Sequence, residues 1–134
     1  MTKASVLIVE DEVIISMAMR IRLKKMDYDV PAVARTGEEA VGLAMQHRPD
    51  VILMDIRLAG EIDGVEAAAQ IHRCADLPII FLTAYSDDDT RARAEATGAA
   101  AFINKPFSER ELTVALELGL HPRGAAPVGP EVTP

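Results

Sequence analysis

The sequence predicts an α/β fold, a three-layer, doubly wound (βα)5 sandwich in which helices cover both faces of a five-stranded parallel sheet. Three observations support this fold class. Short apolar runs alternate five times with longer stretches of helical periodicity. Three of these runs (residues 6–9, 51–54 and 79–82) contain no alternating polar residue, as expected of strands buried on both faces. The length of 134 residues and a hydrophobic content of 49% suit one domain with a substantial core.

The expected strands are the five apolar runs, at residues 5–9, 30–34, 51–54, 78–82 and 99–103. Between them, apolar residues recur at helical spacing. They are Ile14, Met17, Ala18 and Ile21 in the first helix, Ala40, Leu43 and Ala44 in the second, and Leu112, Ala115 and Leu116 in the fifth. A fourth helix is expected over residues 87–97. We expect the methionines Met17, Met19 and Met26, and the single cysteine Cys74, to be buried.

Capping signals mark the helix ends. Thr36 precedes Glu39 by three residues, and Ser108 precedes Glu111 by the same spacing, which is the pattern of a capping box. Arg48 and Pro49 are expected to end the second helix, and Gly98 the fourth. We therefore place a folded domain at residues 1–120 and a disordered, proline- and glycine-rich tail at residues 121–134.

Charge and composition disfavour several classes of function and location. The net charge of −7 disfavours binding to nucleic acid or to an anionic membrane. No segment fits a signal peptide or a membrane span. A single cysteine allows no internal disulfide, which fits a reducing compartment, so we expect a cytoplasmic protein.

Polar residues follow four of the expected strands. Glu10, Asp11 and Glu12 follow the first strand, Asp55 the third, Thr83 the fourth and Lys105 the fifth. The carboxyl ends of parallel strands meet at one edge of the sheet, where ligands bind in such folds. The sequence therefore predicts that several carboxylates, one hydroxyl and one ammonium lie around a single crevice.

This set of groups suits phosphoryl chemistry. Clustered carboxylates repel one another unless a cation lies among them, and oxygen ligands favour Mg²⁺ or its substitute Mn²⁺. A carboxylate such as Asp55 can attack phosphorus and form an acyl phosphate. The metal, Lys105 and Thr83 would then neutralise and contact the phosphoryl oxygens.

Each residue has a simpler interpretation on its own. Acidic residues such as Glu10, Asp11 and Glu12 are common at a helix start. Asp55 could be a loop acid, Thr83 a structural residue and Lys105 a solvated lysine in a turn. The joint arrangement favours the functional reading, because the right residue types follow successive strands.

Four segments resemble the signature segments of bacterial response-regulator receiver domains. They are Val9-Glu-Asp-Glu12, Leu53-Met-Asp-Ile56, Leu82-Thr-Ala84 and Asn104-Lys-Pro-Phe107. The resemblance covers roughly residues 5–119, and the ordered set of four is highly specific. It implies a flavodoxin-like fold with strand order 2-1-3-4-5 and a stand-alone receiver of the chemotaxis type. Such a protein signals within a two-component phosphorelay and assists its own phosphorylation and dephosphorylation without being an enzyme.

The resemblance also implies a role for each site residue. Asp55 matches the phosphoacceptor. Glu10 and Asp11 match the acidic pair that holds Mg²⁺ together with Asp55, and the backbone carbonyl of Arg57 is a further expected ligand. The remaining roles are contact with the phosphoryl group by Thr83 and Lys105, switching by Thr83 and Phe102, and tuning of dephosphorylation by Arg57 and Tyr85.

Three departures from the family pattern stand out. Residues 58–64 form a connection one residue longer than usual and without its proline. Asp27 stands where receivers often have glycine, and aspartate tolerates the left-handed conformation expected there. Arg57 and Tyr85 are bulky, so we expect them to shield the acyl phosphate from water and to prolong its lifetime.

The fourth helix is the expected mobile element. It contains Ala92, Ala94 and Ala96 but no Leu, Ile, Val or Phe, so little apolar area anchors it. The alternative is that this alanine-rich segment is only a good helix former without a switching role.

The resemblance implies partners but leaves their roles open. The phosphodonor would be a histidine kinase or a histidine phosphotransfer protein, and the downstream partner a phosphotransfer or effector protein. A homodimer through the fourth helix, fifth strand and fifth helix is one arrangement, and a monomer is the other. Two alternative functions remain, a phosphorylation-independent pseudo-receiver and a small aspartyl-phosphate phosphohydrolase. The second is disfavoured because Arg57 stands where such enzymes carry an acid.

Overall fold

A five-stranded parallel sheet in the order β2-β1-β3-β4-β5 forms the centre of the molecule. The computed structural model describes residues 3–84 and 88–121. Its elements alternate along the chain as predicted, and their bounds are β1 Val6–Val9, α1 Val13–Lys25, β2 Val33–Ala34, α2 Gly37–His47, β3 Val51–Asp55, α3 Gly64–Cys74, β4 Ile79–Thr83, α4 Asp88–Ala96, β5 Ala101–Asn104 and α5 Glu109–Leu120. The predicted doubly wound fold class and strand order are confirmed.

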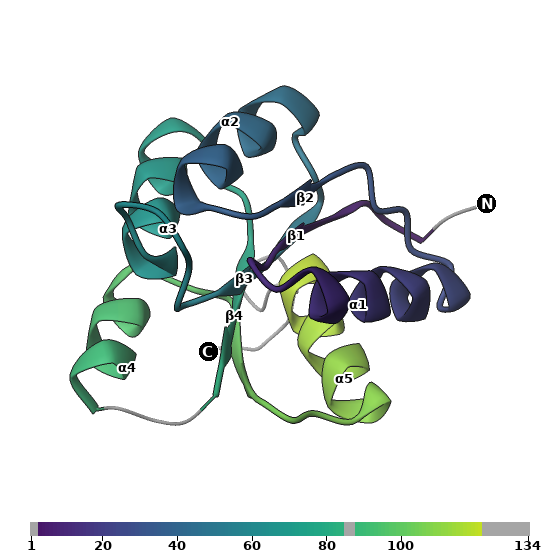
Figure 1. Cartoon of the computed structure of the whole chain (residues 1–134). Coiled ribbons are helices and arrows are strands. Elements are labelled where there is room, and N and C mark those ends of the chain that lie inside the picture. Colours follow the sequence, from purple (N-terminus) through teal and green to yellow (C-terminus); the bar gives the residue numbers. More distant parts are fainter. Residues whose placement is uncertain (1–2, 85–87, 122–134) are drawn as a thin grey trace, which may run out of the picture.

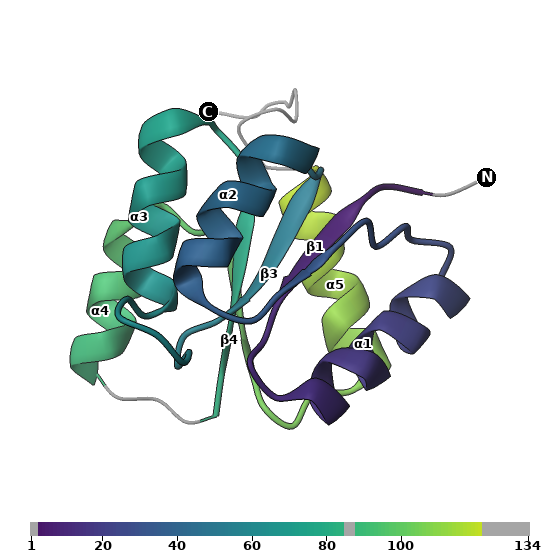
Figure 2. The ribbon, with the colours of Figure 1, turned by 45° about the horizontal axis from the view of Figure 1, so that its top comes forward.

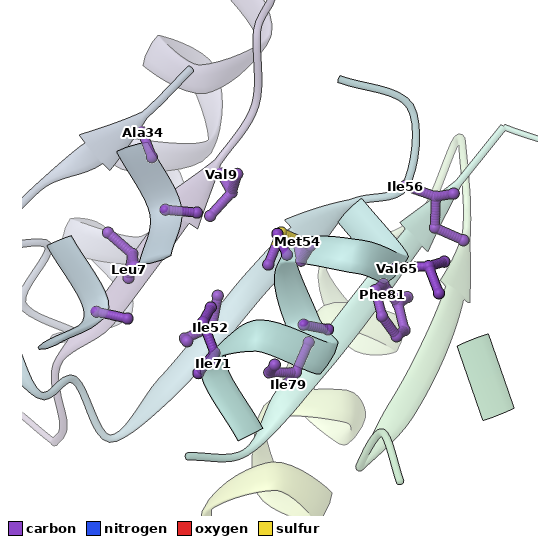
Figure 3. Packing of buried hydrophobic residues seen from close by; sticks show 14 of the residues in the cluster. Leu7, Val9, Ala34, Ile52, Met54, Ile56, Val65, Ile71, Ile79 and Phe81 are labelled. Atoms are coloured by element: carbon purple, nitrogen blue, oxygen red, sulfur yellow. The ribbon is translucent and has the colours of Figure 1, made fainter. Parts of the chain in front are cut away.

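Helices cover both faces of the sheet. Helices α2 and α3 lie against one face, with α4 beyond α3, while α1 and α5 lie against the other (Figures 1 and 2). Two apolar clusters correspond to the two faces, and Figure 3 shows the one beneath α2 and α3. Strands β1, β3 and β4 supply fully buried side chains to both clusters, which explains why their sequences lack polar alternation.

Helix α1 buries a different face from the one that its apolar spacing indicated. Ile14, Met17 and Ile21 are 82%, 56% and 57% exposed, whereas Met19 and Leu23 are buried. The prediction that Met17 is a core residue is therefore wrong. Apolar residues surround the first half of this helix, so periodicity alone does not determine which side faces the sheet. The result is an exposed apolar face on α1.

Strand β2 is shorter than the predicted run of residues 30–34. Pro31 has no N–H to donate to a neighbouring strand, so regular pairing starts only at Val33, opposite Ile8. Cys74 is exposed and not buried as expected, because it is the last residue of α3 and lies beyond Ile71, the last buried position of that helix.

Local backbone signals agree more closely with the structure. Asp27 has a φ of 70° and Gly98 a φ of 81°, as expected for left-handed positions. The full capping box at Ser108 is present, whereas Thr36 accepts from Glu39 N but the Glu39 carboxylate accepts from Arg35 N. Helix α3 begins with a capping box formed by Asp63 and Glu66 that the sequence reading missed.

The predictions on membrane spans and on the C-terminal tail concern different parts of the chain. Within the described residues, no helix is long and apolar enough to cross a membrane. The tail predicted at residues 121–134 lies, apart from His121, outside the described residues.

Candidate functional site

Several of the predicted site residues line one hollow at the carboxyl ends of the strands. The hollow has a volume of about 250 Å³, and its lining includes Asp11, Asp55, Thr83 and Lys105. Asp55 is the last residue of β3 and Thr83 the last of β4, while Asp11 and Lys105 follow β1 and β5. Parallel pairing of these strands brings residues up to 94 positions apart in sequence to one edge of the sheet.

Three carboxylates form the acidic part of the site. Glu10, Asp11 and Asp55 each offer an oxygen, and these atoms lie within 4.8 Å of one another. Glu10 is fully buried and Asp55 nearly so. Such a group of oxygen donors fits a hard divalent cation such as Mg²⁺, which would offset the repulsion among the carboxylates.

Lys105 joins two of these carboxylates. Its Nζ donates to Glu10 Oε1 at 3.0 Å and to Asp55 Oδ2 at 2.9 Å. Burial lowers the pKa of Lys105, but the hydrogen bond and charge of Asp55, followed by those of Glu10, outweigh this effect and raise the pKa above its ordinary value. Lys105 therefore keeps its positive charge beside Asp55 at neutral pH.

A backbone N–H group donates to one oxygen of each carboxylate. Glu10 Oε2 accepts from the N–H of Glu12 at 3.0 Å, and Asp55 Oδ1 accepts from the N–H of Arg57 at 3.3 Å. Asp11 Oδ2 accepts from the N–H of Ala59 at 3.1 Å, although Ala59 lies 48 positions away. Each carboxylate is thus held in a defined orientation.

Gly64, at the start of α3, packs against the backbone of Asp55, a contact that the sequence reading missed. Its N–H donates to Ile56 O at 2.7 Å, which brings the start of α3 close to the end of β3. A Cβ at position 64 would collide with the carbonyl oxygen of Asp55 and would lie 2.9 Å from Ile56 Cα. A glycine in the first turn of a helix, directly after the capping Asp63, was the available sequence signal.

Phe102, the expected switch aromatic, contacts the ring of Phe81 and the guanidinium of Arg91. Its ring stacks on the buried Phe81 with a centroid distance of 5.7 Å. The guanidinium of Arg91, on α4, lies 4.6 Å from the centroid of the Phe102 ring, which makes a cation–π contact. Helix α4 buries only Ala94, in agreement with its predicted weak apolar anchoring.

The two expected tuning positions differ in what the structure describes. Arg57 is exposed and lines the hollow. The buried Ile56 and the partly buried Thr90, which the sequence reading did not single out, also line it. Tyr85 lies outside the described residues.

A second, apolar hollow adjoins the first. It has a volume of about 570 Å³ and lies between α1 and the start of α5, with Ile14, Ala18 and Phe107 among its lining residues. Ala84 and Lys105 line both hollows, so the two share a wall. Ile14, which belongs to the exposed apolar face of α1, thus lies in a hollow that adjoins the acidic site.

Comparison with known families gives one match that covers most of the chain. The family model described as the response regulator receiver domain matches residues 6–117. The chain is 41% identical over 115 residues to the transcriptional regulatory protein PdtaR of Mycobacterium tuberculosis, which covers 86% of this chain and 56% of that protein. It is 40% identical over 111 residues to the probable transcriptional regulator ycf27 of Guillardia theta, covering 83% of this chain and 43% of the other. The chain therefore spans about half the length of these curated relatives.

Solved structures show the same likeness. The signal receiver domain of a modulated diguanylate cyclase from Desulfovibrio desulfuricans superposes with a TM-score of 0.83 and 41% identity, covering 88% of this chain and 94% of that one. The response regulator domain of Thermotoga maritima CheB gives a TM-score of 0.73 and 32% identity, covering 94% and 98%.

Proposed function

This chain belongs to the response regulator receiver domain family, and from that premise we propose that it accepts a phosphoryl group on Asp55 from a histidine kinase or a histidine phosphotransfer protein in a Mg²⁺-dependent reaction. Receiver domains are signalling proteins. One observation carries the proposal: the carboxylate of Asp55, at the end of a buried strand, lies 2.9 Å from Lys105 Nζ and within 4.8 Å of oxygens from Glu10 and Asp11.

The transfer would proceed by attack of an Asp55 carboxylate oxygen on the phosphorus of phosphohistidine. A P–O bond forms while the P–N bond breaks, and an imidazole protonated on its other nitrogen leaves as a neutral ring with the electron pair. The ammonium of Lys105 and the hydroxyl of Thr83 contact the phosphoryl oxygens. Mg²⁺, when held by Glu10, Asp11, Asp55 and the carbonyl of Arg57 (or Mn²⁺ in its place), supplies further neutralisation of charge.

The same residues would support loss of the phosphoryl group to water. Arg57 is exposed and lines the hollow, and its side chain would reduce the approach of water to Asp55. We therefore expect a long-lived acyl phosphate. Rapid loss of the phosphoryl group from isolated phosphorylated protein, and no acceleration in Arg57→Ala, would contradict this expectation.

Phosphorylation would act on α4 through Thr83 and Phe102. The modification adds roughly one and a half to two negative charges at one point. Movement of Thr83 toward these charges frees space beside Phe102, whose ring already contacts Arg91 of α4. Since α4 buries only Ala94, a shift between two positions of this helix costs little. The alternative, that α4 is merely a good helix former, predicts no change in its backbone amide protection on phosphorylation.

We place the phosphodonor on the apolar groove between α1 and the start of α5. A helix of the donor that covers this groove would bring its phosphohistidine to the edge of the acidic hollow, because Ala84 and Lys105 belong to both. Arg22 lines the groove, which favours a donor helix with an acidic residue at its margin.

This docking is tested with Ile14→Asp. A charge at this exposed position should slow transfer from a phosphorylated kinase at least about tenfold, since it buries a carboxylate in an apolar contact. Labelling by the small donor acetyl phosphate should not change. Val114→Asp, on the exposed face of α5, is the matched control. Equal transfer to the two variants would contradict the assigned surface.

Two roles of the phosphorylated protein fit this proposal. It would either pass the phosphoryl group to a downstream phosphotransfer protein or bind an effector directly. Both roles would place the protein in the cytoplasm, the compartment in which kinases obtain their phosphoryl group. The face formed by α4, β5 and α5, where Val114 and Leu118 are exposed beside Phe102, offers a surface for an effector or for a second copy of the chain.

Exposure of the purified protein to acetyl phosphate and Mg²⁺, followed by measurement of intact mass, tests the proposal. A Mg²⁺-dependent phosphoryl adduct on the wild type, absent from Asp55→Asn, is the expected result. A lapsed pseudo-receiver would bind Mg²⁺ weakly and form no adduct. A phosphohydrolase would instead turn over a small phosphomonoester.

A further inference from the structure

The connection between β3 and α3, residues 56–63, is held against the start of α2. Ala59 pairs with Thr36 in an isolated parallel bridge. Gly60 has a φ of 99°, a conformation that suits glycine and turns the chain away from the bridge. Residues 58–63 therefore run alongside the first turn of α2 before α3 begins.

Glu38 is the α2 side chain that holds this connection. Its Oε2 accepts from the N–H of Glu61 at 3.2 Å. Its Oε1 lies beside Gly60, only 2.9 Å from where a Cβ on that glycine would be. Ile62 fills the space over Gly37, where its Cδ1 would lie 3.0 Å from an added Cβ. Glycines at positions 37 and 60 thus allow α2 and the connection to approach closely, with Glu38 between them.

The opposite side of the same connection reaches the acidic site. The N–H of Ala59 donates to Asp11 Oδ2 at 3.1 Å. Asp11 is only half-buried, and its carboxylate belongs to the trio whose oxygens lie within 4.8 Å of one another. Ala59 and Glu61 are two residues apart, so a displacement of one shifts the other. Glu38 is therefore linked to Asp11 through two backbone N–H groups of one short segment.

We propose that Glu38 is a positioning residue for cation binding: it anchors residues 58–63 so that the N–H of Ala59 holds the Asp11 carboxylate toward Glu10 and Asp55. This inference rests on the proposed function. Glu38 touches neither the cation nor the phosphoryl group and acts only through the connection. It therefore sets how tightly Mg²⁺ binds, but not the rate of transfer once Mg²⁺ is bound.

Three variants separate this role from effects of charge or stability. Glu38→Ala removes the acceptor for the Glu61 N–H. Glu38→Gln keeps an acceptor oxygen but removes the charge. Glu39→Ala, one residue further along α2, removes a carboxylate that accepts from Arg35 N and makes no described contact with residues 58–63, so it controls for weakening of the helix start.

The primary measurement is the Kd for Mg²⁺ by calorimetry on the full chain, together with the rate of labelling by acetyl phosphate as a function of Mg²⁺ concentration. We expect Glu38→Ala to raise the Kd about tenfold, as for loss of an outer group that orients a metal ligand. The labelling rate at saturating Mg²⁺ should equal that of the wild type. Glu38→Gln and Glu39→Ala should bind Mg²⁺ as the wild type does.

Gly60→Ala tests the same contact by a change within residues 58–63 instead of a change in Glu38. A Cβ at this position meets Glu38 Oε1 and disfavours the φ of 99°, so it should displace the connection and raise the Kd for Mg²⁺ in the same direction. Circular dichroism of each variant verifies that the fold persists.

The outcomes distinguish this inference from the proposed function. A wild-type Kd in Glu38→Ala, or a Kd in Glu38→Gln as high as that in Glu38→Ala, overturns the positioning role while labelling of the wild type leaves the proposed function intact. A wild type that neither binds Mg²⁺ nor forms an adduct overturns both.

Discussion

Substitution of Gly64 by alanine tests whether the start of α3 fixes the position of Asp55. The added Cβ would collide with the carbonyl oxygen of Asp55 and lie 2.9 Å from Ile56 Cα and 3.0 Å from the carbonyl carbon of Asp55. All three atoms belong to the backbone at the end of β3, which pairs with β4 and has no side-chain rotation to relieve the contact. Either α3 moves outward or the end of β3 moves toward the hollow.

These contacts indicate how much Gly64→Ala should lower the free energy of unfolding and the rate of labelling of Asp55. Overpacking in a close-packed interior costs about 1–3 kcal/mol, and contact with backbone places Gly64→Ala at the upper end of that range. Displacement of a reacting group by about 1 Å lowers a rate on the order of 100-fold. We therefore expect a loss of about 2–3 kcal/mol in the free energy of unfolding, with labelling of Asp55 slowed more than the fraction of folded protein accounts for.

Gly42→Ala is the matched control. Gly42 lies within α2, and a Cβ there would meet nothing within 4 Å. This change should raise the free energy of unfolding by about 1 kcal/mol, as for glycine to alanine in a helix, and leave labelling unchanged. Urea unfolding and the rate of labelling by acetyl phosphate measure both quantities. A Gly64→Ala protein with wild-type stability and wild-type labelling would refute the reasoning.

Three smaller changes test other parts of the structure. Asp27→Gly should raise the free energy of unfolding, by less than about 1 kcal/mol, because glycine adopts the φ of 70° without steric cost; a loss in urea unfolding would contradict this. The pKa of Tyr28 is raised above 10.0, first by burial and second by the charge of Glu117, so the folded state resists loss of the phenolic proton. Its stabilising contribution is complete below pH 10.0 and declines as the pH rises through the folded pKa, so the wild type should lose stability above pH 10.0 more steeply than Tyr28→Phe; parallel pH profiles would count against it. Arg91→Ala should lower the free energy of unfolding by about 1 kcal/mol or less, since it removes a partly exposed cation–π contact with Phe102, and should increase amide exchange in α4; unchanged exchange would show that Arg91 does not restrain this helix.

The acidic site could be predicted from sequence because parallel strands make its geometry simple. Asp55 and Thr83 end buried strands, and Asp11 and Lys105 follow two others, so strand order alone brings the four together. The left-handed conformation at Asp27 was predictable for a different reason, because receivers often have glycine at this position and aspartate tolerates a positive φ.

Features that depend on tertiary packing were not predictable. Helix α1 has apolar residues on more than one side, and only its packing against the sheet shows that Met19 and Leu23 face inward while Ile14 and Met17 face solvent. The late start of regular pairing in strand β2, at Val33, follows from Pro31, which has no N–H to donate although it lies within the apolar run of residues 30–34.

The supports of the site were also hidden from sequence reasoning. Gly64 contacts Asp55 across the end of β3, and Glu38 reaches residues 58–63 from a different helix. Glu38 has no local pattern that distinguishes it from an ordinary surface glutamate. The position of Gly64 directly after the capping Asp63 is a local signal, but it does not show which backbone atoms the glycine contacts. Such supports depend on distances between elements, which the spacing of residues in one chain does not determine.

The phosphorylation of Asp55 is tested most directly by trapping the acyl phosphate and locating it. The protein is treated with acetyl phosphate and Mg²⁺, reduced with borohydride, and digested for peptide mass spectrometry. The account predicts reduction to homoserine at position 55, dependent on Mg²⁺, with Glu10 and Asp11 unmodified. Trapping at another carboxylate, or no trapping under conditions that label another receiver domain, would contradict it.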